Sequence, residues 1–301
     1  MKVLVPILAV FCYVCCSPKT NEIFPVDESY QQEIIDWQKE RNRNIKSPKG
    51  WLSVIGLYWL QEGRNKIGSD PSSDIVFPDI AQPRVGDIYL ENGELYFRAF
   101  GEAYVSKNDK GFREGTMYSD ASRVPTELSH KSLYFYVIRR GNKFGLRLKN
   151  TLAEKRFSFK GIDNFPINNK YRFTAKISKS ESHDSILIND IVGTETMYKI
   201  ENVISFKIKK KTFDLLAFDG GKDKLFIVFS DNTNNKSTYG GGRFIYVNKP
   251  EPGSDQVVID FNKAYNPPCA FTDFATCPIP PPNNHIDIEI NAGEKKISDA
   301  H

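Results

Sequence analysis

The sequence predicts a mainly β protein with one long helix near its N-terminus, and three observations lead to this fold class. Short alternating or apolar runs, broken by turn residues, fill the chain from residue 51 to about 248. A helical pattern precedes them at residues 27–45. Residues 260–286 hold six prolines and two cysteines, a composition that excludes a long helix or a central strand. We therefore expect a helix, a small β-sandwich, and a second β-rich domain that carries a Pro/Cys-rich C-terminal loop.

The helix is predicted from the spacing of its larger side chains. Tyr30, Ile34 and Trp37 recur at intervals of four and three residues, which places them on one face of an α-helix. Asp27 is a suitable N-cap, and acidic residues come early and basic residues late, as the helix dipole favours.

The strands are predicted from alternation and from turn signals. Asn92-Gly93 separates two strand-like runs, and the segments RRGNKFGLRL and FDGGKDKLFIVF have the same form, so we expect hairpins at all three. No helical period lies between these runs, which indicates an all-β architecture after the helix. A boundary near residues 129–132 then divides the chain into a helix plus first β-domain at 27–128 and a second β-domain at 129–301.

The first residues resemble a bacterial lipoprotein signal. MKVLVPILAVFCYVCCS has one early lysine, an apolar core and then cysteines, and it is too short to span a membrane as a helix. Residues 1–16 are the predicted signal segment, Cys16 the lipidated residue with Cys15 as the alternative, and residues 17–26 a polar tether. An ordinary secretory signal is the other interpretation. Either way we expect an exported protein, and the first interpretation predicts one that contacts a bacterial membrane only through an N-terminal lipid.

Charge and composition exclude some classes of partner. The net charge of +4 is spread over 301 residues without long runs, whereas nucleic-acid binding usually requires a clustered basic surface. The hydrophobic fraction of 40% is enough to build a sizeable core. We expect no nucleic-acid partner.

The two late cysteines allow several roles. Once Cys16 is lipidated, only Cys269 and Cys277 remain as ordinary thiols, and such a pair in an exported chain favours a disulfide. Two buried free thiols and a nucleophilic Cys269 are the alternatives. Zinc binding with His285 is disfavoured, because the cysteine spacing is longer than that of structural zinc sites. We expect no metal and no cofactor.

Polar residues around the C-terminal loop are the candidate ligand contacts. Three glycines before Arg243 allow close approach of a ligand, and its guanidinium suits a carboxylate or phosphate. A structural pair of Arg243 with Asp260 is the alternative. The full set of candidates comprises Arg147, Tyr239, Arg243, Asp260, Asn262, Tyr265, Asn266 and Asn283.

An enzymatic role stays open on the sequence. The chain has no Gly-x-Ser-x-Gly elbow, no His-Glu-x-x-His, no phosphate loop and no dinucleotide fingerprint. Asp231 and Asp260 are able to do acid–base work if they face one pocket. A hydrolase that uses this pair, or a thiol enzyme that uses Cys269, is therefore the alternative to binding.

The order of motifs resembles DUF1684, a bacterial family of unknown function. The likeness covers nearly the whole chain after the signal, and it is carried by residues 48–70, 144–150, 156–168, 227–244 and 260–295. It implies no established activity.

A weaker likeness lies in EGRNKIGSDPSSDIVFPD, which is similar to the start of forkhead-associated β-sandwich domains. Those domains bind phosphothreonine through an arginine after the strand-three glycine and a Ser-x-x-His loop. Here Ser69 follows Gly68 and no Ser-x-x-His follows, so the resemblance implies a shared scaffold without the shared ligand.

The leading hypothesis is a binding module at the cell envelope for a polar or anionic small molecule. Its predicted pocket lies between residues 239–244 and 260–283. A structural envelope lipoprotein is a further alternative.

Overall fold

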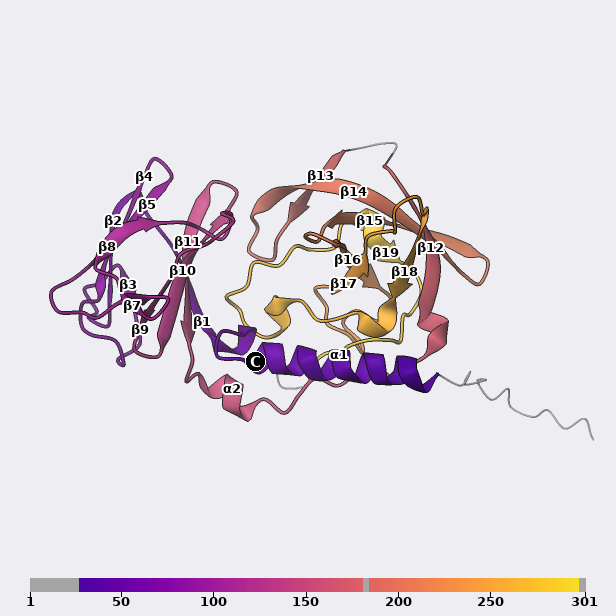
Figure 1. Ribbon diagram of the computed structural model, residues 1–301, viewed down its shortest axis with the longest axis horizontal. Coiled ribbons are helices and arrows are strands. Elements are labelled where there is room, and N and C mark those ends of the chain that lie inside the picture. Colours follow the sequence, from indigo (N-terminus) through magenta and orange to yellow (C-terminus); the bar gives the residue numbers. More distant parts are fainter. Residues whose placement is uncertain (1–26, 181–183, 298–301) are drawn as a thin grey trace, which may run out of the picture.

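A computed structural model describes residues 27–180 and 184–297 of the chain. The predicted signal segment, the lipidated Cys16 with its alternative Cys15, and the tether lie outside the described residues. The predicted fold class is confirmed, because one long helix precedes three β-sheets. Figure 1 shows two units side by side, a first unit of residues 51–150 and a second unit of residues 151–297.

Helix α1 (Glu28–Lys46) packs on the second unit, although it precedes the first in the sequence. Tyr30 donates a hydrogen bond to Oδ2 of Asp260 at 2.8 Å. Near the other end of the helix, Nε of Arg41 donates to Oε1 of Glu294 at 2.9 Å. These two contacts join α1 to segments more than 200 residues away in the chain. The predicted helix face packs against the protein, since Tyr30 and Ile34 are buried.

The first unit is a β-sandwich of two sheets around one apolar core. One sheet has the strand order β1-β11-β10-β9-β6-β7 and the other has the order β3-β2-β4-β5-β8. The strands are β1 (Val54–Trp59), β2 (Gly63–Gly68), β3 (Ile75–Val76), β4 (Gly86–Glu91), β5 (Glu94–Ala99), β6 (Ser106–Lys107), β7 (Lys110–Gly111), β8 (Glu114–Met117), β9 (Glu127–His130), β10 (Leu133–Arg140) and β11 (Lys143–Asn150).

The predicted boundary at residues 129–132 falls inside this sandwich, between paired strands β9 and β10. The polar turn between those strands has the same composition as a linker between domains. Only the pairing of β9 with β10 shows that it is a turn within one sheet. The chain instead leaves the first sandwich after Asn150. The Asn92-Gly93 turn does form a hairpin, with φ of 52° and 83°, as two-residue hairpins of this type require.

Strands β10 and β11 have one apolar and one polar face because side chains alternate along a strand. Phe135, Val137 and Leu146 enter the sandwich core. On the opposite face Tyr136 is paired in register with Arg147. This polar face is turned toward the second unit, and Trp51 contacts both Arg147 on this face and the C-terminal loop.

The second unit is built around a sheet that is nearly closed into a barrel. Its strand order is β17-β16-β15-β14-β12-β18, and the two edge strands lie beside each other. Its elements are the short helix α2 (Glu154–Ser158), β12 (Arg172–Ser178), β13 (Ser185–Asn189), β14 (Glu195–Ile208), β15 (Lys211–Asp219), β16 (Lys224–Asp231), β17 (Arg243–Asn248), β18 (Gln256–Asp260) and β19 (His285–Ile286).

The Pro/Cys-rich loop is irregular but closely packed. After β18 it forms three short 3-10 turns, at Phe261–Lys263, Pro268–Ala270 and Pro282–Asn284. Strand β19 then pairs in parallel with β16. Because prolines lack an N–H, the loop is fixed by side-chain and tertiary contacts instead of by a strand ladder.

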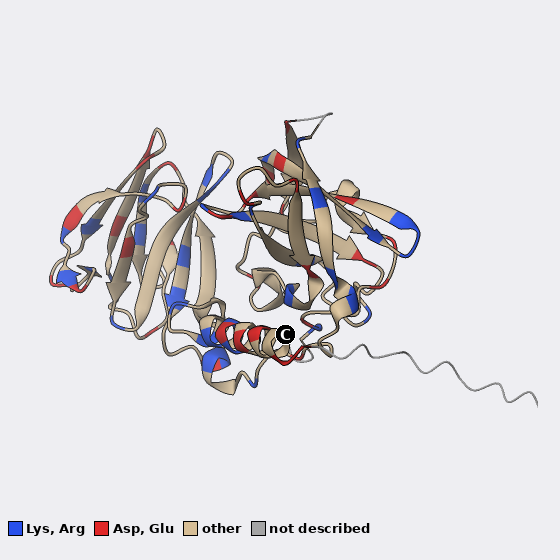
Figure 2. Cartoon of the chain, turned by 45° about the vertical axis from the view of Figure 1, so that its right-hand side comes forward, with Lys and Arg blue, Asp and Glu red and all other residues tan. Residues whose placement is uncertain are grey.

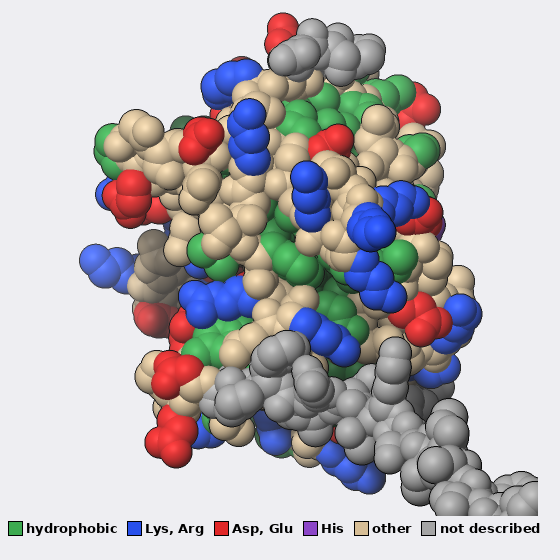
Figure 3. Space-filling model, turned by 90° about the vertical axis from the view of Figure 1, so that its right-hand side faces the viewer, with side chains coloured by type: hydrophobic (Ala, Val, Ile, Leu, Met, Phe, Trp, Pro, Cys, Tyr) green, Lys and Arg blue, Asp and Glu red, His purple; other side chains and the backbone are tan. Residues whose placement is uncertain are grey.

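Charged side chains are distributed over both units. Figure 2 shows lysines and arginines at the C-terminal end of α1 and at α2, whereas Figure 3 shows them scattered over the outer face of the second unit. Among residues 27–180 and 184–297, no helix is both long and apolar enough to cross a membrane.

Candidate functional site

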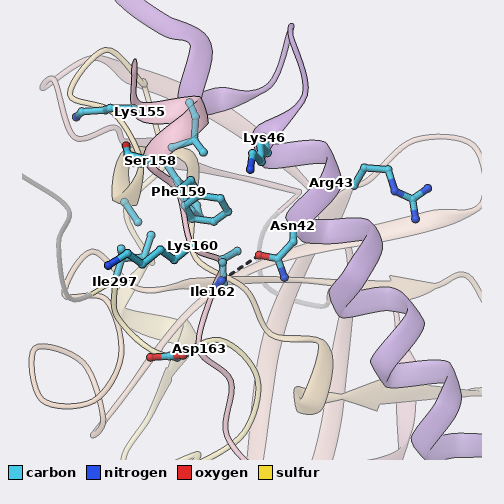
Figure 4. Close-up of a pocket in the computed structure, with 14 residues that line it drawn as sticks. Asn42, Arg43, Lys46, Lys155, Ser158, Phe159, Lys160, Ile162, Asp163 and Ile297 are labelled. Atoms are coloured by element: carbon cyan, nitrogen blue, oxygen red, sulfur yellow. Dashed lines mark hydrogen bonds between the residues drawn. The ribbon is translucent and has the colours of Figure 1, made fainter. Parts of the chain in front are cut away.

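A groove lies where the C-terminal end of α1 meets the segment 155–163 and the start of the Pro/Cys-rich loop. Its volume is about 870 Å³, and Figure 4 shows the side chains that line it. We call it the α1–α2 groove. The lining residues are Asn42, Arg43, Lys46, Leu52, Lys155, Ser158, Phe159, Lys160, Gly161, Ile162, Asp163, Ala270, Phe271 and Ile297.

Local hydrogen bonds hold the walls of this groove together. Oδ1 of Asn42 accepts the backbone N–H of Ile162 at 2.9 Å, which ties α1 to the segment after α2 (Figure 4). Nε of Arg156 donates to the carbonyls of Lys46 and Ser47 at 3.0 and 3.1 Å, where the last carbonyls of a helix lack intrahelical partners. The groove is therefore fixed by contacts between segments more than 100 residues apart.

The floor of the groove is apolar. Leu52, Ile162 and Phe271 belong to one buried cluster, and the half-buried Phe159 packs against it. The rings of Phe159 and Phe271 meet edge to face at 6.4 Å between centroids. Figure 4 shows the Phe159 ring in the middle of the groove.

The rim of the groove is cationic. Lys46, Lys155 and Lys160 are exposed and make no ion pair with any described residue. Arg43 pairs with Glu40 at 2.8 Å and points away from the centre of the groove (Figure 4). Asp163 is the single carboxylate of the lining. The arrangement is suited to an anionic group held over an apolar surface.

The residues predicted as ligand contacts lie elsewhere, and Arg243 shows why. Its guanidinium is fully buried and donates to Oδ2 of Asp231 at 2.5 Å and to the carbonyls of Ile290 and Ala292 at 2.9 and 2.5 Å. Burial lowers the pKa of Arg243, and the charge of Asp231 opposes that shift. The predicted structural pair with Asp260 is wrong, because Asp231 is the partner. The predicted ligand position beside Arg243 is filled by the protein's own groups.

Asp260 belongs to a separate buried network. It accepts hydrogen bonds from Tyr30 and from the backbone N–H and Nδ2 of Asn262. Nδ2 of Asn262 also donates to the carbonyl of Asn168 at 3.0 Å. Asp231 and Asp260 therefore do not share a pocket, and the acid–base pair predicted for a hydrolase is not formed.

Tyr265 and Asn266 fix the loop against α1. Arg41 lies over the Tyr265 ring at 4.5 Å, and its Nη2 donates to the Asn266 carbonyl at 2.8 Å. The backbone N–H of Asn266 donates to Oε2 of the buried Glu294 at 2.6 Å. Burial raises the pKa of both Tyr265 and Glu294. Within the described structure these residues make structural contacts.

Asn283, predicted as a ligand contact, is exposed, and its neighbour Asn284 makes the hydrogen bonds inside the protein. Asn284 is fully buried, and it bonds both the N–H and the carbonyl of Leu216 and the carbonyl of Val228. Asn283 was predicted to contact a ligand, and no sequence feature singled out Asn284, because a 3-10 turn at Pro282–Asn284 sets which side chain points inward.

Arg147 differs from the other predicted residues. It is only 2% exposed, yet Nε and Nη2 have no hydrogen-bond partner, and Nη1 reaches the Tyr136 hydroxyl only at 3.4 Å. Its guanidinium lies 5.1 Å from the Trp51 ring centroid and 5.9 Å from that of Tyr136. The neighbouring Lys149 lies on the same face of β11, and burial lowers its pKa to about 8. Two cations thus meet at the junction of the two units.

The predicted cysteines lie at the same junction. Both are buried free thiols, and the backbone N–H of Cys269 donates to Sγ of Cys277 at 3.1 Å. The Tyr239 hydroxyl donates to the Cys269 carbonyl at 3.3 Å, and burial raises the pKa of Tyr239. The disulfide stays a prediction. His285 contacts Ser230 at 3.0 Å, and no three His, Cys, Asp or Glu side chains gather into a metal-binding group in the described part of the chain.

The groove itself was not predicted from the sequence. Its cations come from α1 and from EKRFSFKGID at residues 154–163, and its floor combines Phe159 and Ile162 of that decapeptide with Leu52 and Phe271 from two other segments. The alternation of basic and aromatic residues in that decapeptide is the only local signal, and it does not reveal which helix packs beside it.

Residues 157–295 match DUF1684, described as a protein of unknown function. This match confirms the family resemblance over that part of the chain. No curated protein matches the chain.

Solved structures give partial likenesses. An uncharacterized protein of Haloarcula marismortui, solved by NMR, is 29% identical, with 48% of this chain and 82% of that chain covered and a TM-score of 0.40. The FhaA forkhead-associated domain is 17% identical, covering 30% of this chain and 96% of that one at a TM-score of 0.21. A second such domain, with phosphothreonine-dependent interactions, is 16% identical, covering 31% and 92% at 0.21. These three likenesses carry no argument about the fold or the ligand of this chain.

Proposed function

We propose that this protein is an exported, lipid-anchored binding protein for an organic anion that carries an apolar part. The observation that supports this most is the α1–α2 groove, which combines a volume of about 870 Å³ with a lysine rim and an apolar floor. Ligand sites are typically concave and mainly apolar, with a few polar groups that fix orientation. This groove has that composition, whereas the predicted surroundings of Arg243 are filled by protein.

The chemistry of the groove selects the class of ligand. Lys46 and Lys160 supply exposed ammonium groups without carboxylate partners among the described residues, so a carboxylate or phosphate over the groove gains two opposite charges. Phe159 and Phe271 offer an aromatic surface for the apolar part. A small inorganic anion uses only the rim, and a neutral apolar molecule uses only the floor.

The anchor is supported by the N-terminal sequence and by the place where α1 begins. A lipid at Cys16 and the tether at residues 17–26 lead into α1 at Glu28. The helix has 19 residues and is about 28 Å long at 1.5 Å per residue, and the groove lies at its far end. Replacement of Cys16 by Ala is expected to release the protein from membranes, whereas Cys15→Ala is not. Retention of the Cys16→Ala protein on membranes would contradict the anchor.

Calorimetric titration of the full-length protein tests the ligand class. The probes are hexanoate and hexyl phosphate, which are short enough to stay monomeric, with hexanol as the uncharged comparison. The anions are expected to bind and hexanol to bind at least tenfold more weakly. Absence of binding by both anions, or equal binding of hexanol, would overturn the proposal and favour a purely structural lipoprotein.

A pair of double variants locates the binding. Lys46→Gln with Lys160→Gln is expected to weaken hexyl phosphate binding about tenfold or more, because each exposed charge contributes up to about 1 kcal/mol. Lys207→Gln with Lys210→Gln removes the same charge from an exposed hairpin distant in sequence and is expected to leave the affinity unchanged. Equal losses in both would show general electrostatic attraction and no site.

A further inference from the structure

The two thiols of the C-terminal loop are held in contact by backbone geometry. Cys269 lies in the 3-10 turn Pro268–Ala270, which directs its backbone N–H to Sγ of Cys277 at 3.1 Å. Cys269 is 6% exposed and Cys277 is 4% exposed. The pair is therefore assembled in its reduced form, in a position from which it needs little rearrangement to react with itself.

Segments from both units surround the pair. Trp51 and Tyr239 pack on the cluster that holds both cysteines, and Trp51 in turn lies beside Arg147 of β11. These residues come from four of the five segments that carry the family resemblance. Segments that are far apart in the sequence thus converge on the thiols.

Arg147 supplies a positive charge without a close counter-ion to this junction. Among the described residues it forms no ion pair, and its Nε and Nη2 atoms make no hydrogen bond although they are buried. Its charge acts on Cys277. A guanidinium that keeps free donors beside a thiol pair is able to stabilise negative charge on sulfur.

We propose that Cys269 and Cys277 form a redox pair that exchanges with an external disulfide, with Arg147 as a positioning residue. The thiolate of one of the two cysteines attacks one sulfur of a small disulfide, a mixed disulfide forms, and the other half leaves as a thiolate that takes up a proton. The second cysteine then loses its proton and attacks the sulfur of the first. The second half of the external disulfide leaves as a thiol, so the protein pair is oxidised and the external disulfide is reduced.

The first test treats the native full-length protein with oxidised glutathione and maps the cysteine peptides by mass. We expect a peptide pair that joins Cys269 to Cys277 and is lighter by two hydrogen atoms, restored by dithiothreitol. Mapping separates this product from Cys12, Cys15 and Cys16. Failure of the native protein to oxidise, while protein unfolded in guanidinium does, would overturn the proposal and leave two inert core thiols.

Two single cysteine variants test the exchange step. Cys269→Ser and Cys277→Ser are tested separately, and at least one of them is expected to accumulate a mixed disulfide with glutathione on the remaining cysteine, because no resolving thiol remains. Absence of a mixed disulfide in both variants would contradict the exchange.

The role of Arg147 is tested by the pH profile of oxidation. Arg147→Lys keeps the charge and is expected to keep the profile, whereas Arg147→Met is expected to move its midpoint to higher pH. Three other charged groups lie close to this part of β11: Lys149 on the same strand, Glu127 on β9, and Lys49. Their charges are the same in every variant, and each variant is compared with wild type at constant ionic strength. Identical profiles for Arg147→Met and wild type would remove Arg147 from the proposal. The test is independent of anion binding in the groove, since hexyl phosphate affinity is measured separately.

Discussion

Two buried arginines, Arg243 on β17 and Arg147 on β11, were both candidate ligand contacts, and they differ in how many hydrogen-bond partners the protein supplies. Arg243 has a carboxylate at 2.5 Å and two carbonyl partners, and only its Nε lacks a hydrogen bond. Arg147 has one long hydrogen bond to Tyr136, and both Nε and Nη2 lack partners. The first completes the core of one unit. The second lies between the units with bonding capacity unused.

The difference shows how to separate a structural arginine from a functional one. Burial alone does not decide the role, because both side chains are almost fully covered. What decides it is whether the protein supplies the partners, since an unpaired buried charge costs several kcal/mol and a paired one is nearly neutral. An arginine left without partners at a junction is therefore the better candidate for interaction with reacting groups or ligands.

The largest effect is expected when the satisfied pair is broken. Arg243→Met should lower the free energy of unfolding by about 3–5 kcal/mol, because Asp231 is left buried without its counter-ion. Urea unfolding followed by tryptophan fluorescence measures this loss.

The matched control for Arg243 removes both charges. Arg243→Met combined with Asp231→Leu should recover a substantial part of the stability, because no buried charge remains. A loss below about 1 kcal/mol in the single variant would show that this pair is not the structural element that its contacts indicate.

A smaller effect with a defined pH window is expected at Lys149. Burial lowers its pKa to about 8 in the folded protein, against an ordinary value near 10.5. Below pH 8 the group is charged in both states, so the folded state bears the cost of a partly desolvated ammonium. Between about pH 8 and pH 10.5 the unfolded chain binds more protons, so the stability contribution of Lys149 rises with pH.

Comparison of wild type with Lys149→Met isolates this contribution from other lysines and tyrosines. The difference in urea midpoint between the two proteins should change between pH 7 and pH 10, with wild type gaining relative to the variant. A constant difference across that window would mean that Lys149 keeps an ordinary pKa.

The smallest effect is expected at Arg147. Arg147→Met should change the free energy of unfolding by no more than about 1 kcal/mol in either direction, because the lost cation–π contacts with Trp51 and Tyr136 are offset by removal of an unpaired buried charge. The same urea assay measures it. A loss as large as that of Arg243→Met would make the two arginines equivalent and remove the contrast between them.

Much of the fold was predictable because its signals are local. The helix, the Asn92-Gly93 hairpin and the alternating strands depend on spacing and on residues that tolerate positive φ. The boundary near residue 129 was misplaced because a polar turn and a linker have the same composition. Only the pairing of β9 with β10 separates these two cases.

The candidate site was less predictable because its parts are distant in sequence. Arg243 and Asp260 were expected to pair, yet each has a different partner, Asp231 and Tyr30. Asn283 was expected to contact a ligand, yet it is exposed, and a 3-10 turn directs the neighbouring Asn284 into the interior. Hydrogen-bond partners depend on which segments pack together, and residue type restricts that choice only weakly.

The sequence by itself determined the β class, the helix, the family resemblance, and the expectation of an exported chain with two late cysteines. These depend on periodicity, turn chemistry and composition, which act over a few residues. The tertiary structure alone decided that α1 packs on the second unit, that a lysine-rimmed groove forms beside it, and that Arg147 faces Trp51 and the thiol pair. Those features depend on the packing of distant segments, because a buried surface is completed only when both of its sides are present.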